Sequence, residues 1–232
     1  MYYPYYFEPT YILVIIGALL SVWASSNVKS TYKKYSSIAS SSGLTGAEAA
    51  RRILEANNIY GITITHISGE MTDCYVPSKK ELRLSDSSYA STSIAGLGIA
   101  AHECGHAIQD ACDYLPLTIS SSISPACAVG SNIGFPLVIF GIVLSFDVLI
   151  NVGILLFSLS VVIALLTLPV EFNASNRAMM SLESMGILSR EECKGTRKVL
   201  TAAGLTYVAA AAAAILSLLR LLLLSGNRRR RR

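Results

Sequence analysis

Charged residues are scarce in this sequence, and that scarcity decides its class. Only 15% of the 232 residues are Asp, Glu, Lys or Arg, whereas 52% are hydrophobic. A soluble globular domain carries about 25% charged residues, so the composition excludes that class and indicates membrane spans. The formal net charge is +4, and residues 228–232 are all arginine. We therefore do not interpret the positive charge as a nucleic-acid surface.

Cysteine and histidine are also sparse. The five cysteines are odd in number and show no paired spacing, which argues against a disulfide framework and suits a reducing compartment. They are Cys74, Cys104, Cys112, Cys127 and Cys193. The chain has only three histidines, and two of them fall within five residues of each other.

Four apolar runs interrupt the polar sequence, at residues 11–25, 125–146, 148–168 and 205–224. A helix of about 20 residues crosses a hydrocarbon core of about 30 Å. The first run has no charged segment before it and no clear cleavage site, so we expect an uncleaved anchor. Trp23 and the tyrosines Tyr2, Tyr3, Tyr5 and Tyr6 suit its two interfaces. The second and third runs are separated by Asp147, which predicts a transmembrane hairpin.

The membrane orientation is signalled twice, and the two signals conflict. Lys29, Lys33 and Lys34 follow the first run, which favours the cytoplasm for that end. Four crossings then put both termini outside, yet the arginines at 228–232 favour a cytoplasmic C-terminus. Either the last run does not cross fully or one charge cluster misleads. We favour a cytoplasmic catalytic face, with the arginines holding anionic headgroups.

These signals divide the chain into five parts. We predict an N-terminal transmembrane anchor at 1–26, a catalytic part at 27–124, a transmembrane hairpin at 125–168, a third-ligand helix with a charged segment at 169–200, and a C-terminal apolar helix with a polyarginine tail at 201–232. Together they predict a mainly α membrane protein with about four transmembrane helices and a small sheet.

Within the catalytic part, a capping box at Thr45 and Glu48 predicts a helix that runs to Ala56. Strands are predicted at 62–67, 72–76 and 81–85. The last strand contains Leu82, Arg83 and Leu84, in which leucine alternates with charge. As an edge strand it could bind an extended substrate, although it could equally complete a small sheet.

The segment His102-Glu103-Cys104-Gly105-His106 has the pattern H-E-x-x-H on a predicted helix. Four residues make about one turn, so both imidazoles leave the same face and can hold one Zn²⁺. A metal-bound water loses its proton near neutral pH, and Glu103 is placed to accept and relay it. A partly exposed helix with three polar positions is the plainer alternative. The motif is typical of metalloproteases, and we favour the zinc interpretation.

Glu171 is the candidate for a third ligand. An even number of crossings returns the chain to the side it left, so the residues after the hairpin can meet the histidines. Pro169 predicts a helix start and Gly186 its end. Glu171 could instead complement the dipole of that helix. With the motif upstream we favour a His₂Glu site, whose fourth position stays open as a catalytic zinc requires.

Several stretches resemble the YugP-like neutral zinc metallopeptidases, small gluzincin-type proteins of bacterial membranes with a layout similar to HtpX-type proteases. They are residues 29–35, 44–48, 82–85, 101–103 and 168–172. The resemblance implies a gluzincin-like peptidase core, zinc ligands at His102, His106 and Glu171, and Glu103 as general base. One departure is Ser175, where many gluzincins have an aspartate that orients the first histidine.

Three functions are compatible with these sequence features. The first is a membrane-anchored zinc endopeptidase acting on membrane or membrane-proximal proteins, with Arg177, Tyr75 and Tyr207 as guesses for the group that stabilises the oxyanion. The second is a site-2-type intramembrane protease, which the polar residues before the motif and the position of Glu171 argue against. The third is a non-catalytic metal-binding membrane scaffold, which the intact Glu103 argues against.

Overall fold

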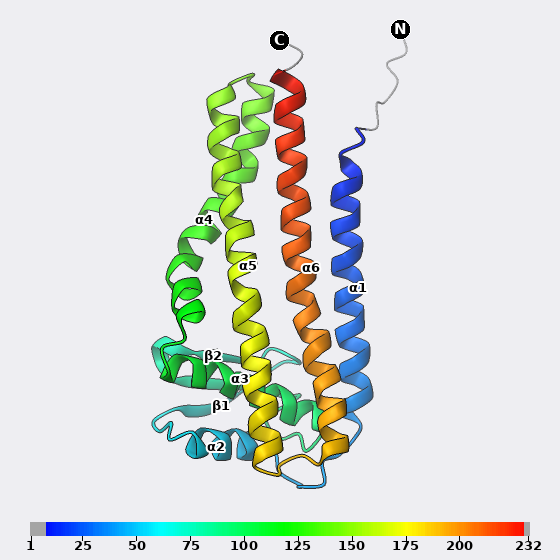
Figure 1. The fold of residues 1–232 in the computed structure, drawn as a ribbon, viewed down its shortest axis with the longest axis vertical. Helices are drawn as coiled ribbons and strands as arrows, with labels where there is room; N and C mark the ends of the chain where they lie inside the picture. Colours follow the sequence, from blue (N-terminus) through cyan, green and yellow to red (C-terminus); the bar gives the residue numbers. More distant parts are fainter. Residues whose placement is uncertain (1–7, 230–232) are drawn as a thin grey trace. The chain divides into compact units, whose positions relative to one another are not determined.

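The computed structural model describes residues 8–229, and side chains as far as residue 226. In this part of the chain, six α-helices and three strands follow one another (Figure 1). The helices are α1 (Tyr11–Ser36), α2 (Gly46–Ala56), α3 (Ile94–Ala111), α4 (Leu115–Val143), α5 (Asp147–Ser184) and α6 (Arg190–Arg229). The strands are β1 (Thr63–Ile67), β2 (Cys74–Val76) and β3 (Glu81–Ser85), with a short 3₁₀ turn η1 (Pro77–Lys79) between the last two. The predicted mainly helical fold with a small sheet is confirmed.

The chain forms two compact units. One unit, here the apolar unit, comprises Met1–Ala24, Ser120–Thr167 and Thr206–Arg232. The other, here the site unit, comprises Ser25–Ile119 and Leu168–Leu205. The five-part division drawn from the sequence stays a prediction. The interface tyrosines Tyr2, Tyr3, Tyr5 and Tyr6 and the arginines at 230–232 lie outside the described residues.

Within residues 8–229, four helices are long and apolar enough to cross a membrane, as the sequence predicts: α1, α4, α5 and α6. The hairpin of α4 and α5 is packed through glycines in the apolar unit. A Cβ added at Gly134 would lie 2.6 Å from the Phe157 backbone nitrogen and 2.8 Å from the Gly153 carbonyl oxygen. Small residues at such positions let membrane helices approach closely. The segment 117–124 belongs to α4.

The helix start predicted at Pro169 is wrong. Pro169 lies inside α5, which runs without a break from the apolar residues to Ser184. Proline removes one helical hydrogen bond and kinks soluble helices, but an interrupted helix next to a lipid-facing run leaves more backbone groups unpaired. Glu171 therefore lies within a long helix, and the alternative role of complementing a helix N-terminus falls away.

Of the two interpretations left open for Leu82, Arg83 and Leu84, the edge strand is wrong, and the strand that completes a small sheet is confirmed. The sheet order is β1-β3-β2, with β1 parallel and β2 antiparallel to β3. Because β3 is paired on both sides, its backbone cannot accept an extended substrate. Leu82 and Leu84 are fully buried and belong to the core of the site unit.

Helix α3 lies at the centre of the site unit. Its N-cap is Ser93, whose hydroxyl accepts from the Gly96 backbone N–H. Small residues line its buried face, and the thiol of Cys104 there points at the Ala50 carbonyl oxygen of α2 at 3.6 Å. Helix α2 begins with the predicted capping box and ends at Ala56. The core therefore fixes the rotation of α3 about its axis, and with it the direction of the motif.

Candidate metal and catalytic site

The two motif histidines lie one turn apart on α3 and face each other. Their Nε2 atoms are 3.2 Å apart. Their rings meet edge to face, with centroids 4.7 Å apart. Two imidazole nitrogens at this separation either share one proton or converge on one cation.

Glu171 reaches this pair from α5, although it is 65 positions further along the chain than His106. Its Oε2 atom is 3.2 Å from Nε2 of His102 and 3.6 Å from Nε2 of His106. Helix α5 can come this close because position 105 is glycine. A Cβ there would lie 2.4 Å from the Ala174 carbonyl oxygen, so any larger residue would push α5 away.

The three side chains fit a divalent cation. One ligand atom from each of His102, His106 and Glu171 lies within 4.8 Å of the other two. Oε2 of Glu171 is buried and has no hydrogen-bond partner among the described residues. A buried carboxylate oxygen without a partner is costly, and a cation between the three groups would satisfy it. Two imidazoles and a carboxylate are a donor set that catalytic zinc uses.

The outer nitrogen of each histidine ring has its own partner. Nδ1 of His102 is 3.1 Å from the Ser175 hydroxyl, and Nδ1 of His106 is 3.1 Å from Oε1 of Gln109. The structure thus places the predicted Ser175 beside the ring that an aspartate would otherwise orient. A neutral hydroxyl holds the ring in place but polarises it less than a carboxylate does.

The sequence did not predict that Gln109 is part of the site. Its side chain is fully buried, and its amide nitrogen donates to the Val170 carbonyl oxygen at 2.8 Å and to Oδ1 of Asn173 at 3.1 Å. These two bonds fix the amide, so its oxygen accepts the Nδ1–H of His106 and leaves Nε2 free for a metal. The available signal was spacing, since a residue three positions after His106 lies on the same helix face.

Glu103 is buried beside the histidines on α3 and exposes 8% of its surface. Burial raises the pKa of its carboxyl group, and His102 and His106 oppose that shift. A carboxylate with a raised pKa binds a proton more readily near neutral pH, as a general base must. Burial lowers the pKa of His106, but its contact with Glu171 and the charge of Glu103 outweigh burial and raise it.

The third histidine, His66, is not part of this cluster. It lies on β1 with Nε2 2.6 Å from Oδ1 of Asp86, and both side chains are exposed. Its exposed position on β1 keeps it apart from the candidate metal ligands.

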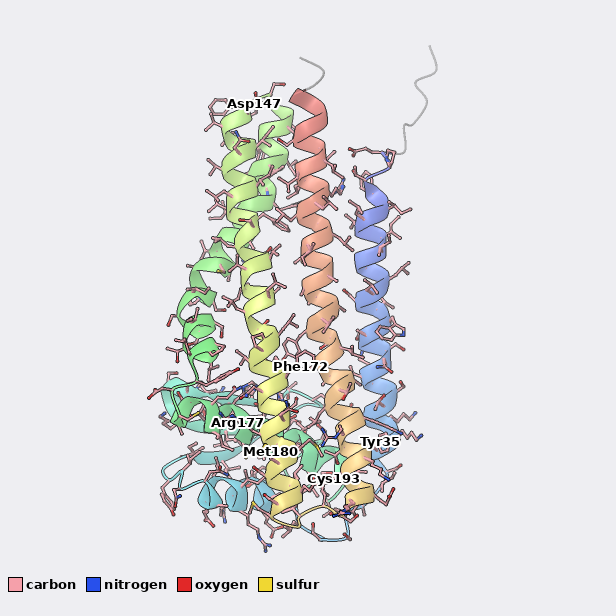
Figure 2. All side chains as sticks on the ribbon, viewed as in Figure 1. Tyr35, Asp147, Phe172, Arg177, Met180 and Cys193 are labelled. Atoms are coloured by element: carbon pink, nitrogen blue, oxygen red, sulfur yellow. The ribbon has the colours of Figure 1, made fainter. Side chains whose placement is uncertain are left out.

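The three residues guessed to stabilise an oxyanion have other surroundings. The Tyr75 hydroxyl donates to Oδ2 of Asp110 at 2.7 Å. Nε of Arg177, which Figure 2 labels on α5, donates to Oδ1 of Asn173 at 2.8 Å. Tyr207 belongs to the apolar unit. None of these contacts assigns an oxyanion role.

Comparisons with known proteins found a matching family and a similar protein. The family model described as "Putative neutral zinc metallopeptidase" matches residues 10–226. The chain is also 44% identical over 200 residues to the "Putative membrane protease YugP" of Bacillus subtilis (strain 168). This match covers 86% of this chain and 89% of that protein. No solved structure matches it significantly. With a family match over nearly its whole length, the chain belongs to the neutral zinc metallopeptidase family.

Proposed function

We propose that this chain is a membrane-anchored endopeptidase of the gluzincin type, which hydrolyses peptide bonds of membrane or membrane-proximal proteins. One observation supports this most strongly: the buried, unpartnered Oε2 of Glu171 lies beside the facing Nε2 atoms of His102 and His106.

In this proposal His102, His106 and Glu171 hold the metal. Ser175 and Gln109 hold the two imidazole rings so that both Nε2 atoms point inward. Zinc, when bound, supplies a Lewis acid that activates water and polarises the scissile carbonyl group. Glu103 accepts the proton of the attacking water and passes it to the leaving amine. Its burial among the site residues excludes bulk water from that transfer.

The substrate backbone needs an unpaired strand edge if it binds in extended form. The inner strand β3 cannot supply such an edge. Strand β2, which pairs antiparallel with β3, is an edge strand of the sheet. Helix α3 also contacts β2. We infer that an extended substrate pairs with β2, next to the helix that carries the motif.

The two alternative functions are less well supported. A site-2-type protease carries its motif on a spanning helix, whereas α3 is not among the candidate spans of the described chain. A scaffold with a structural metal needs no buried carboxylate beside the histidines, yet Glu103 is there.

The test combines metal content with proteolysis. We expect the purified full-length protein to bind one zinc and to cleave proteins of its own membrane fraction. Glu103→Gln should keep the zinc and lose at least about 100-fold in cleavage rate, because a general base contributes about 10²–10⁴-fold. Glu55→Gln, an exposed glutamate of α2, is the matched control and should cleave normally.

Two outcomes separate the alternatives. Zinc binding by the wild type without cleavage of any membrane-fraction protein would support the scaffold and refute the peptidase. Cleavage only within the spans of substrates would support the site-2 type. The proposed cytoplasmic face is tested by labelling a cysteine placed at exposed Lys79 in intact cells, where a membrane-impermeant reagent should not react.

A further inference from the structure

A large groove lies in the site unit away from the histidines. It has a volume of about 1130 Å³ and is bounded by residues of α1, α5 and α6. Ligand pockets of proteins have volumes of about 300–1,000 Å³, so the groove is large enough for a drug-sized ligand. Neither the proposed peptidase chemistry nor the sheet uses it.

The groove is strongly basic. Five exposed basic side chains and one exposed acidic side chain line it. The basic residues are Lys34, Arg190, Lys194, Arg197 and Lys198, and the acidic one is Glu183. Such a collection of like charges raises the local concentration of anions.

Most of this charge is not neutralised inside the protein. Lys194 pairs with Glu191 at 2.7 Å. Among the described residues, the other four basic side chains of the groove form no ion pair. Four cations around one hollow repel one another, and an anionic ligand would relieve that repulsion.

The floor of the groove is formed by buried side chains. Tyr35, Cys193 and Ala202 line it and are buried. Figure 2 labels Tyr35 on α1 and Cys193 on α6. The helices touch at Gly195, where an added Cβ would lie 2.9 Å from the Tyr35 ring. The floor is therefore formed by two helices, α1 and α6, in direct contact.

The sequence on either side of the groove sets its depth relative to the bilayer. Asn27, which lines it, comes two residues after the first apolar run, and Leu205 is the first residue of the last run. One end of the groove thus lies where two candidate spanning helices change from polar to apolar, which is the headgroup level of a membrane. Basic pockets between such helices bind anionic headgroups.

We propose that this groove binds the headgroup of an anionic phospholipid. The basic side chains contact the phosphate, while the acyl chains leave past Ala202 and Leu205 toward the apolar runs. The shared chemistry is a phosphate ester, and the position of the groove favours the lipid over a soluble phosphate compound. The site is distinct from the metal centre and does not rest on the proposed peptidase activity.

The test uses the full-length protein in a neutral detergent with three probes: dioctanoyl phosphatidylglycerol, dioctanoyl phosphatidylcholine and glycerol 3-phosphate. Native mass spectrometry gives the dissociation constant of each. We expect the phosphatidylglycerol to bind at least tenfold more tightly than either of the others. Equal binding of glycerol 3-phosphate would overturn the lipid assignment, and equal binding of phosphatidylcholine would overturn the anion site.

The variant Arg190→Gln/Arg197→Gln/Lys198→Gln removes three charges from the groove. Each basic residue near an anionic headgroup contributes about fivefold, so affinity for phosphatidylglycerol should fall roughly a hundredfold. The matched control Arg51→Gln/Arg52→Gln/Lys79→Gln removes three exposed charges elsewhere in the site unit, and it should stay within about threefold of the wild type. Equal losses in both variants would refute a specific site.

A second variant guards against misfolding of the triple substitution. Thr201 lines the groove and is exposed, so Thr201→Trp fills part of the volume without changing any charge. It should weaken phosphatidylglycerol binding while the melting temperature is kept. Unchanged binding would show that the lipid lies elsewhere.

Discussion

Gln109 offers the sharpest test of how the site is held, since it touches a candidate ligand without being one. Its oxygen is 3.1 Å from Nδ1 of His106, and its nitrogen donates to Val170 and Asn173 of α5. Gln109→Leu keeps much of the volume but removes all three contacts. Loss of a partner behind a ligating histidine costs about 10–100-fold in metal affinity. We expect that loss in a zinc competition titration against a chromophoric chelator.

Stability must be separated from positioning in this experiment. Gln109→Leu leaves buried polar groups without partners, which costs about 1–3 kcal/mol. Thr196→Val is the matched control, because Thr196 is fully buried and donates to the Ile94 carbonyl oxygen at 3.0 Å, away from the metal ligands. It should lower the melting temperature and keep the zinc affinity.

Gln109→Glu completes the comparison. Its carboxylate still accepts from His106 but cannot donate to Val170 or Asn173. It should therefore bind zinc within about threefold of the wild type, despite a lower melting temperature. If Gln109→Leu also binds zinc within threefold of the wild type, Gln109 does not position His106 and the reasoning fails.

Two further predictions concern the approach of α5 and the metal itself. Gly105→Ala should lower zinc affinity at least tenfold and destabilise the protein by about 1–3 kcal/mol, because the new Cβ would lie 2.4 Å from the Ala174 carbonyl oxygen. Gly204→Ala is the control, because the new Cβ would meet only the Phe172 ring, at 3.0 Å. It should change the zinc affinity and the stability little in the same titration and melting experiment. Removing zinc with a chelator should lower the melting temperature by an amount equivalent to about 4 kcal/mol when free zinc is 1,000 times its dissociation constant. A His102→Asn/His106→Asn variant should show no such shift; an equal shift would place the zinc elsewhere.

The features predicted well from the sequence are those with local signals. The capping box at Thr45 and Glu48 is present, and the four apolar runs form candidate spanning helices. Each of these signals lies within the element that it specifies or next to it. The element can therefore be predicted without knowing which distant segments it packs against. The facing of His102 and His106 follows in the same way from helical spacing.

The order of the strands in the sheet could not be predicted from such local signals. Leucine alternates with charge in β3, a pattern typical of an edge strand with one wet face. The structure instead buries Leu82 and Leu84 and pairs Arg83 with Glu81 at 2.7 Å on the other face. That local ion pair lets a central strand carry charges. The parallel partner β1 lies well before β3 in the chain, and alternation contains no information about such partners.

The error at Pro169 has a different cause. The rule that proline starts helices holds in water, where the broken helix can expose its backbone. Here the apolar run up to Leu168 and the segment with Glu171 are one helix. With a rise of about 1.5 Å per residue, the Cα atom of Glu171 lies only about 4.5 Å along the axis beyond that of Leu168. The third candidate ligand therefore lies on the same unbroken helix as the apolar run, three residues beyond its end, and a rule for helix starts in soluble proteins could not predict that continuity.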